Sequence, residues 1–122
     1  MKTLILPIVL SVIAALGFAA GTESAAAQTI QPADAPAHVG QTVTVEGDVS
    51  NVHKVAAGVT FIDMGGRYPD NTFTAVILPD DAKKFPDVNS LNGKTVDVTG
   101  AVRLYKGKPE ILLTDAAQIK AK

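Results

Sequence analysis

The stretch that decides the fold is residues 40–49, GQTVTVEGDV, which returns as residues 93–102, GKTVDVTGAV. Both copies follow the pattern Gly-x-Thr-Val-x-Val-x-Gly-x-Val, in which valine alternates with a mostly polar residue. This period of two predicts a strand with one buried face. The internal glycines, Gly47 and Gly100, are typical of a bulge or bend in a strand that serves two parts of a curled sheet. The repeat therefore predicts a small closed or nearly closed β-barrel.

The first 27 residues have the composition of an export signal. A positively charged start precedes a mostly apolar run at residues 4–20, and Ala25–Ala27 supplies the small residues that a signal peptidase reads. We expect cleavage after Ala27, which would leave no stable membrane anchor and place the mature chain in the periplasm or outside the cell. The alternative is a retained anchor, because the apolar run is just long enough to span a bilayer.

The remaining chain, about 95 residues long, is enough for one domain. We divide it into an N-terminal arm at residues 28–38 and a barrel domain at residues 39–122. The sequence contains no cysteine, so a packed core rather than disulfides must stabilise the fold.

Formal charge does not by itself indicate a nucleic-acid-binding protein, since the net value is −1. Its distribution is uneven: residues 34–87 hold eight acids and four bases, whereas residues 94–122 hold six bases and three acids. A mixed solvated surface explains this pattern, and so does a basic end that meets phosphates or another anion.

The order of predicted elements is strand, strand, strand, short helix, strand, strand. The strands are expected at residues 41–52, 59–64, 72–78, 95–104 and 110–114, with the helix starting at Pro79 and a tail from Ala116 in which Ile119 packs back. This order is that of the five-stranded, Greek-key OB barrel, an all-β fold. Alternation directs one set of side chains to the core, namely Val43, Val45, Val49, Phe73, Ala75, Ile77, Ile111 and Leu113.

The second predicted strand leaves the orientation of Phe61 open. Asp63 shares a face with Phe61 and is not expected to be fully buried without a partner. Strict alternation therefore places Phe61 on the outer face, whereas a bulge would turn it into the core.

Three segments together resemble the nucleic-acid-binding OB family. They are residues 43–49, the Gly-x-x-Phe-x-x-Met segment at residues 58–64, and residues 91–102. The likeness is to the anticodon-binding type and to small exported bacterial OB-fold proteins. It implies a single-stranded nucleic acid lying across the second and third strands, between the loops at residues 51–58 and 105–109. It also implies that Phe61 stacks on a base.

Aromatic and basic residues near these loops are the candidate ligand-binding residues, because aromatic rings stack on bases and cations neutralise phosphates. The set is Asn51, His53, Lys54, Phe61, Arg67, Tyr68, Arg103, Tyr105, Lys106 and Lys108. The alternative is that the tyrosines cap turns and the lysines keep the surface soluble. A rival function for the same groove is binding a peptide, a small ligand or an envelope protein.

No motif predicts catalysis, a metal or a cofactor. The two histidines, His38 and His53, lie far apart, and no cysteine pair offers a zinc site. Asp63, Asp70 and Asn71 surround a glycine-rich turn without the spacing of a calcium loop. We therefore expect a binding module rather than an enzyme, with single-stranded nucleic acid or a similar anionic polymer as its ligand.

Overall fold

The two copies of the repeat pair with each other. The computed structural model describes residues 27–122, in which β2 (Thr42–Lys54) and β5 (Thr95–Tyr105) run antiparallel. Val45 lies opposite Val98, and both side chains are fully buried. The repeated valine pattern is therefore the buried face of one two-stranded ribbon.

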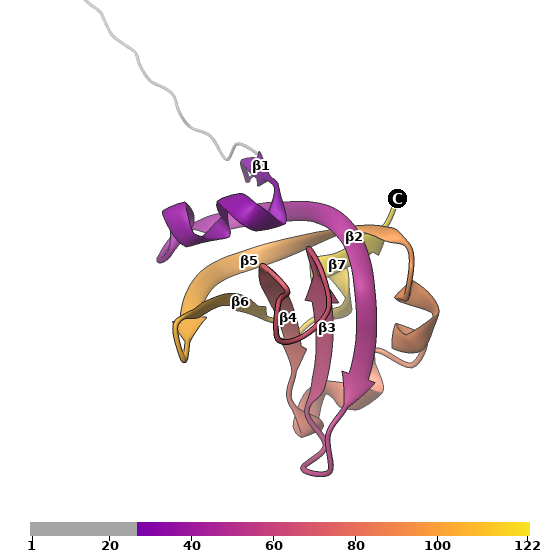
Figure 1. The fold of residues 1–122 in the computed structure, drawn as a ribbon. Helices are drawn as coiled ribbons and strands as arrows, with labels where there is room; N and C mark the ends of the chain where they lie inside the picture. The colour runs from indigo at the N-terminus through magenta and orange to yellow at the C-terminus, as the bar shows by residue number, and fades with distance from the viewer. Residues whose placement is uncertain (1–26) are drawn as a thin grey trace, which may run out of the picture.

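Three further strands close this ribbon into a barrel. β3 (Thr60–Met64), β4 (Phe73–Ile77) and β6 (Lys108–Leu112) follow β2 in the order β2-β3-β4-β6-β5, and β5 pairs back with β2. The β4–β6 pair is parallel and the other pairs are antiparallel. Figure 1 shows β2 and β5 as long curved ribbons around the shorter strands. This is the predicted OB barrel.

Strand β2 serves both halves of the barrel, as predicted. It pairs with β5 as far as Asp48 and with β3 from Val49 onward, with a register shift between Val49 and Asn51. The irregularity thus comes after Gly47 rather than at it. At Gly47 an added Cβ would lie 2.6 Å from Cγ of Pro32, so this glycine permits a close approach of the N-terminal segment.

The barrel interior contains the side chains that alternation assigned to it. The eight predicted core residues are all buried: Val43, Val45, Val49, Phe73, Ala75, Ile77, Ile111 and Leu113. Ile62, Met64, Val96, Val98 and Val102 belong to the same cluster.

Residues predicted to be an N-terminal arm pack onto the barrel. β1 (Thr29–Ile30) pairs in parallel with β2, and the 3-10 helix η2 (Pro32–His38) follows it (Figure 1). Ile30 and Ala35 belong to the hydrophobic core. This segment is therefore part of the folded domain.

Two further connections contain short 3-10 helices. The predicted helix between β4 and β5 consists of η3 (Pro79–Lys84) and η4 (Val88–Leu91), separated by the buried Phe85. After β6, η5 (Ala116–Gln118) leads into β7 (Ile119–Ala121), which pairs with β5. The tail thus adds a strand, and its Ile119 packs on the core as expected.

Two predicted loops are shorter than expected. β2 continues through Lys54, so the first half of the predicted loop at residues 51–58 is strand. The predicted loop at residues 105–109 is reduced to Lys106 and Gly107, and β6 spans Lys108–Leu112 rather than residues 110–114. In both places cross-strand pairing extends the strands beyond what local sequence indicated.

The predicted leader, residues 1–27, lies outside the described residues except for its last one. Within residues 27–122, no helix is long and apolar enough to cross a membrane.

Candidate functional site

A groove of about 500 Å³ lies on the outside of the barrel, between the β5–β6 hairpin and the outer faces of β2 and β3. It is lined by His53, Val55, Phe61, Asp63, Tyr68, Pro69, Thr74, Tyr105, Lys106, Lys108, Pro109 and Glu110. Six of these residues are among the ten predicted from the sequence: His53, Phe61, Tyr68, Tyr105, Lys106 and Lys108.

The centre of the groove is a stacked pair of rings. His53 on β2 is the cross-strand partner of Phe61 on β3, and their ring centroids are 5.3 Å apart with an angle of 25° between the planes. Directly opposed side chains on an antiparallel pair are close enough to stack. Strict alternation therefore held, since Thr60, Ile62 and Met64 are buried on the other face.

Two tyrosines and two lysines also line the groove. Tyr68 is 69% exposed and Tyr105 is 55% exposed, so both rings are accessible to a ligand. Lys106 Nζ lies 5.4 Å from the centroid of Tyr105, and Lys108 Nζ lies 5.5 Å from that of Tyr68. These are cation–π distances. Each tyrosine thus presents a ring beside a positive charge.

The tight hairpin is what brings Tyr105 and Lys108 to the groove. Lys106 and Gly107 have φ values of 52° and 81°, the pattern of a two-residue turn in which both central residues have positive φ. The turn pairs Tyr105 with Lys108 in register.

Asp63 lies at the base of the groove and is only 1% exposed. Its placement on the outer face beside Phe61 agrees with alternation, but its near-complete burial requires a partner, which is His53. The distance from His53 Nε2 to Asp63 Oδ2 is 3.2 Å. Burial raises the pKa of Asp63, while His53, the backbone N–H of Tyr68 and the charge of Lys108 act in the opposite direction.

A second carboxylate, Glu110, is neutralised from outside the groove. Arg103 is its cross-strand partner, and the Nε and Nη2 atoms of Arg103 each lie 2.7 Å from Glu110 Oε2. Glu110 is buried, so this contact offsets the loss of hydration of its charge.

Both acids of the groove have a partner side chain. Glu110 is paired with Arg103, and Asp63 is in contact with His53. Lys106 and Lys108 form no ion pair with an acid within residues 27–122. Lys108 Nζ donates instead to the carbonyl oxygen of Pro69. Two lysine charges thus remain for an anionic ligand.

The other predicted residues do not line the groove. Arg103 acts on it through Glu110, whereas Asn51, Lys54 and Arg67 lie outside its lining. Sequence reasoning missed Glu110 as a groove residue. Predicting a two-residue turn at Lys106–Gly107 would have found Glu110, because the strand register set by that turn places Glu110 opposite Arg103, which was itself a predicted site residue.

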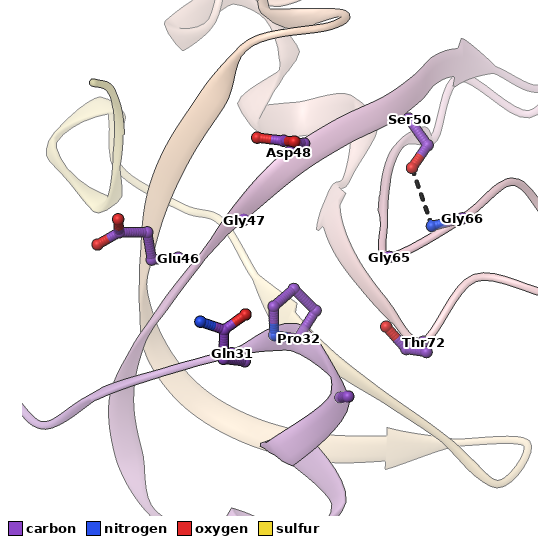
Figure 2. Close-up of a pocket in the computed structure, with 10 residues that line it drawn as sticks. Gln31, Pro32, Glu46, Gly47, Asp48, Ser50, Gly65, Gly66 and Thr72 are labelled. Carbon is purple, nitrogen blue, oxygen red and sulfur yellow. Dashed lines mark hydrogen bonds between the residues drawn. The ribbon is translucent and has the colours of Figure 1, made fainter.

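A second hollow, of about 630 Å³, lies beside Gly47 on the other part of β2. Figure 2 shows Glu46 and Asp48 at its edge, and Ser50 accepting a hydrogen bond of 3.0 Å from the N–H of Gly66. Its charged lining residues are these two acids, so it is poorly suited to a polyanion.

The part of the chain that the structure describes offers no metal site. No group of three or more His, Cys, Asp or Glu side chains in it is placed to hold an ion.

Comparison with known proteins adds evidence on the fold. No protein-family model and no curated protein matches the chain. Among solved structures, OBody AM1L10 bound to hen egg-white lysozyme matches with a TM-score of 0.60 at 19% identity, over 82% of this chain and 98% of that one. Aspartyl-tRNA synthetase from Entamoeba histolytica matches with a TM-score of 0.50 at 21% identity, over 70% of this chain. Asparaginyl-tRNA synthetase from Pyrococcus horikoshii also matches with a TM-score of 0.50, at 18% identity over 75% of this chain.

The chain corresponds to only a small part of the synthetases, 19% and 22% of their respective lengths. At these identities the likeness establishes a shared OB fold.

Proposed function

We propose that this protein is a binding module, not an enzyme, and that the groove binds single-stranded nucleic acid. The observation that carries the proposal is the gathering of four accessible rings and two lysines without acidic partners in one groove. The rings are those of His53, Phe61, Tyr68 and Tyr105. Aromatic platforms beside cations are the combination that binds single strands without sequence preference.

The bases would be held mainly by the stacked pair. Phe61 already stacks on His53, so its ring is fixed in orientation before a ligand arrives. Stacking of one base on an aromatic side chain contributes about 1–3 kcal/mol. A ring held in place loses little further entropy when it binds, so Phe61 is the residue expected to contribute most.

The backbone would be held by Lys106 and Lys108, which line the groove beside the rings of Tyr105 and Tyr68. Each phosphate neutralised on a single strand contributes about −0.7 to the slope of log K against log salt. Two lysine contacts therefore predict a slope of about −1.4. The synthetases that share the fold are enzymes named for tRNA, which agrees with this class of ligand.

The test is fluorescence anisotropy with a labelled single-stranded DNA or RNA oligonucleotide. Phe61→Ala is expected to weaken binding by about fivefold to 150-fold, corresponding to about 1–3 kcal/mol. Lys106→Ala is expected to weaken binding and to make the salt slope shallower by about 0.7. Lys120→Ala, on β7 and outside the groove lining, is the matched control for charge and should change the slope little. Binding that survives the combined Phe61→Ala and Lys106→Ala changes would show that the site is elsewhere.

A second candidate is a protein or peptide partner in the cell envelope. The observation that favours it is that OBody AM1L10, with the same fold, was solved bound to a protein, lysozyme. Val55, Pro69 and Pro109 also give the groove apolar surface. Salt separates the two candidates, because phosphate binding must weaken as salt rises, whereas apolar binding does not. Binding that is insensitive to salt would favour the protein partner.

Export of the chain is a further part of the proposal. It rests on the pattern of residues 1–27. Mass spectrometry of the protein isolated from its cells should find Gln28 at the N-terminus. An intact leader in a membrane fraction would indicate a retained anchor instead.

A further inference from the structure

His53 both lines the groove and contacts a buried acid, Asp63. Its ring stacks on Phe61, and it lies 6.5 Å from Tyr68, with 35% of its side chain exposed. On its buried side, Nε2 approaches Asp63. The same side chain thus lines the ligand-binding surface and contacts the acid beneath it.

The contact between His53 and Asp63 depends on protonation. Their facing atoms, Nε2 and Oδ2, are 3.2 Å apart and have no hydrogen-bond partner within residues 27–122. A buried carboxylate is destabilised unless it is paired with a positive charge. A protonated imidazole supplies that charge, and histidine side chains change charge between about pH 5 and pH 8.

We infer that His53 makes the groove proton-sensitive, so that its affinity for an anionic ligand rises as the pH falls. The inference rests on the proposed function and adds its regulation. Protonation adds one positive charge to a groove lining that already contains Lys106 and Lys108. The titratable and charged groups around His53 are Asp63 on β3, Tyr68 in the β3–β4 loop, Tyr105 and Lys106 at the hairpin, Lys108 and Glu110 on β6, and Lys54 on β2 itself.

These neighbours do not reverse the sign of the effect. Glu110 is paired with Arg103, so its charge is already offset. If Asp63 takes up a proton as well, the groove gains positive charge in the same direction. Acidification therefore makes the groove more positive through either member of the His53–Asp63 pair.

The experiment measures oligothymidylate binding at about pH 8 and about pH 5.5, where neither the thymine bases nor the phosphodiesters of the probe change charge. Affinity of the unmodified protein is expected to rise about three- to tenfold on acidification, the effect of one added charge at a partly exposed site. Asp63→Asn removes the proton uptake of the acid itself, so in that background the ratio should remain, and adding His53→Gln should abolish it. His38→Gln is the matched control, because the other histidine of the chain lies outside the groove lining and should leave the ratio unchanged.

The outcomes separate this inference from the proposed function. Binding that does not change with pH, or a ratio that persists when His53→Gln is added to Asp63→Asn, overturns the inference and leaves the proposed function standing. No binding at either pH overturns both.

A measurement on the unmodified protein covers the case in which His53→Gln does not fold. Binding and protonation affect each other reciprocally. In an NMR titration, saturating oligothymidylate should therefore raise the titration midpoint of the His53 ring and not that of His38. Equal midpoints for His53 with and without the oligonucleotide would contradict the inference.

Discussion

Replacing Gly47 by alanine tests whether the N-terminal segment is an integral part of the domain. A Cβ at this position would lie 2.6 Å from Cγ and 3.0 Å from Cδ of Pro32. Figure 2 shows the Pro32 ring and Gly47 among the residues that line the same hollow. Pro32 is buried and its ring is rigid, so the segment itself must move to relieve the contact.

The size of the effect follows from two opposing terms. Overpacking of this kind destabilises a protein by about 1–3 kcal/mol. Alanine also reduces the conformational freedom of the unfolded chain, which raises the free energy of unfolding by about 0.4–1 kcal/mol. We therefore expect Gly47→Ala to lower the free energy of unfolding by about 1–2 kcal/mol. For a domain of this size the corresponding decrease in Tm is about 5–15 °C.

The assay is a double-mutant cycle followed by thermal and denaturant unfolding. Pro32→Ala removes both ring atoms that the new methyl group would meet, so Gly47→Ala should be nearly neutral in that background. The double mutant is therefore expected to be about 1–2 kcal/mol more stable than the sum of the two single-mutant effects predicts. If Gly47→Ala destabilises the protein equally with and without the proline ring, the segment does not pack on β2 as described.

Three further predictions concern the barrel and the groove. Gly100→Ala would place a Cβ 2.6 Å from Cγ2 of Ile111, so it should destabilise the fold by about 1–3 kcal/mol. Ile111→Leu removes that methyl branch. In a thermal melt, the Gly100→Ala/Ile111→Leu protein should therefore recover part of the lost stability. Lys106→Gly should raise the free energy of unfolding by about 0.5 kcal/mol, because glycine adopts the positive φ of this position more easily than lysine does. Fluorescence anisotropy should show weaker oligonucleotide binding by the same variant. A lower free energy of unfolding would show that Lys106 is not strained by its positive φ. Burial raises the pKa of Asp63 above its ordinary value of 3.8, so its stabilising contribution is complete below that value and is lost as the pH rises through the raised folded-state pKa. Denaturant unfolding of Asp63→Asn across this range should lack that pH-dependent contribution, and an unchanged profile would contradict it.

Residues of the groove were predictable to the extent that their orientation follows from alternation. Phe61 faces outward because its neighbours Ile62 and Met64 are apolar and occupy the opposite positions of β3. Tyr105 and Lys106 were predicted as site residues from their position between two strands, and both line the groove. The burial of Asp63 was not predictable in this way, because it depends on His53 from another strand and on the covering loop around Tyr68.

The sequence alone determined the barrel. The alternating valines and paired glycines of residues 40–49 and 93–102 are local signals, and local signals specify strands and their buried faces. Only the tertiary structure decided that these two stretches pair with each other and that residues 28–38 pack onto the barrel. It also decided that the histidine and the acid at the base of the groove meet. The physical reason is that such contacts join residues distant in sequence, whose distances are set by strand register and chain closure rather than by local pattern.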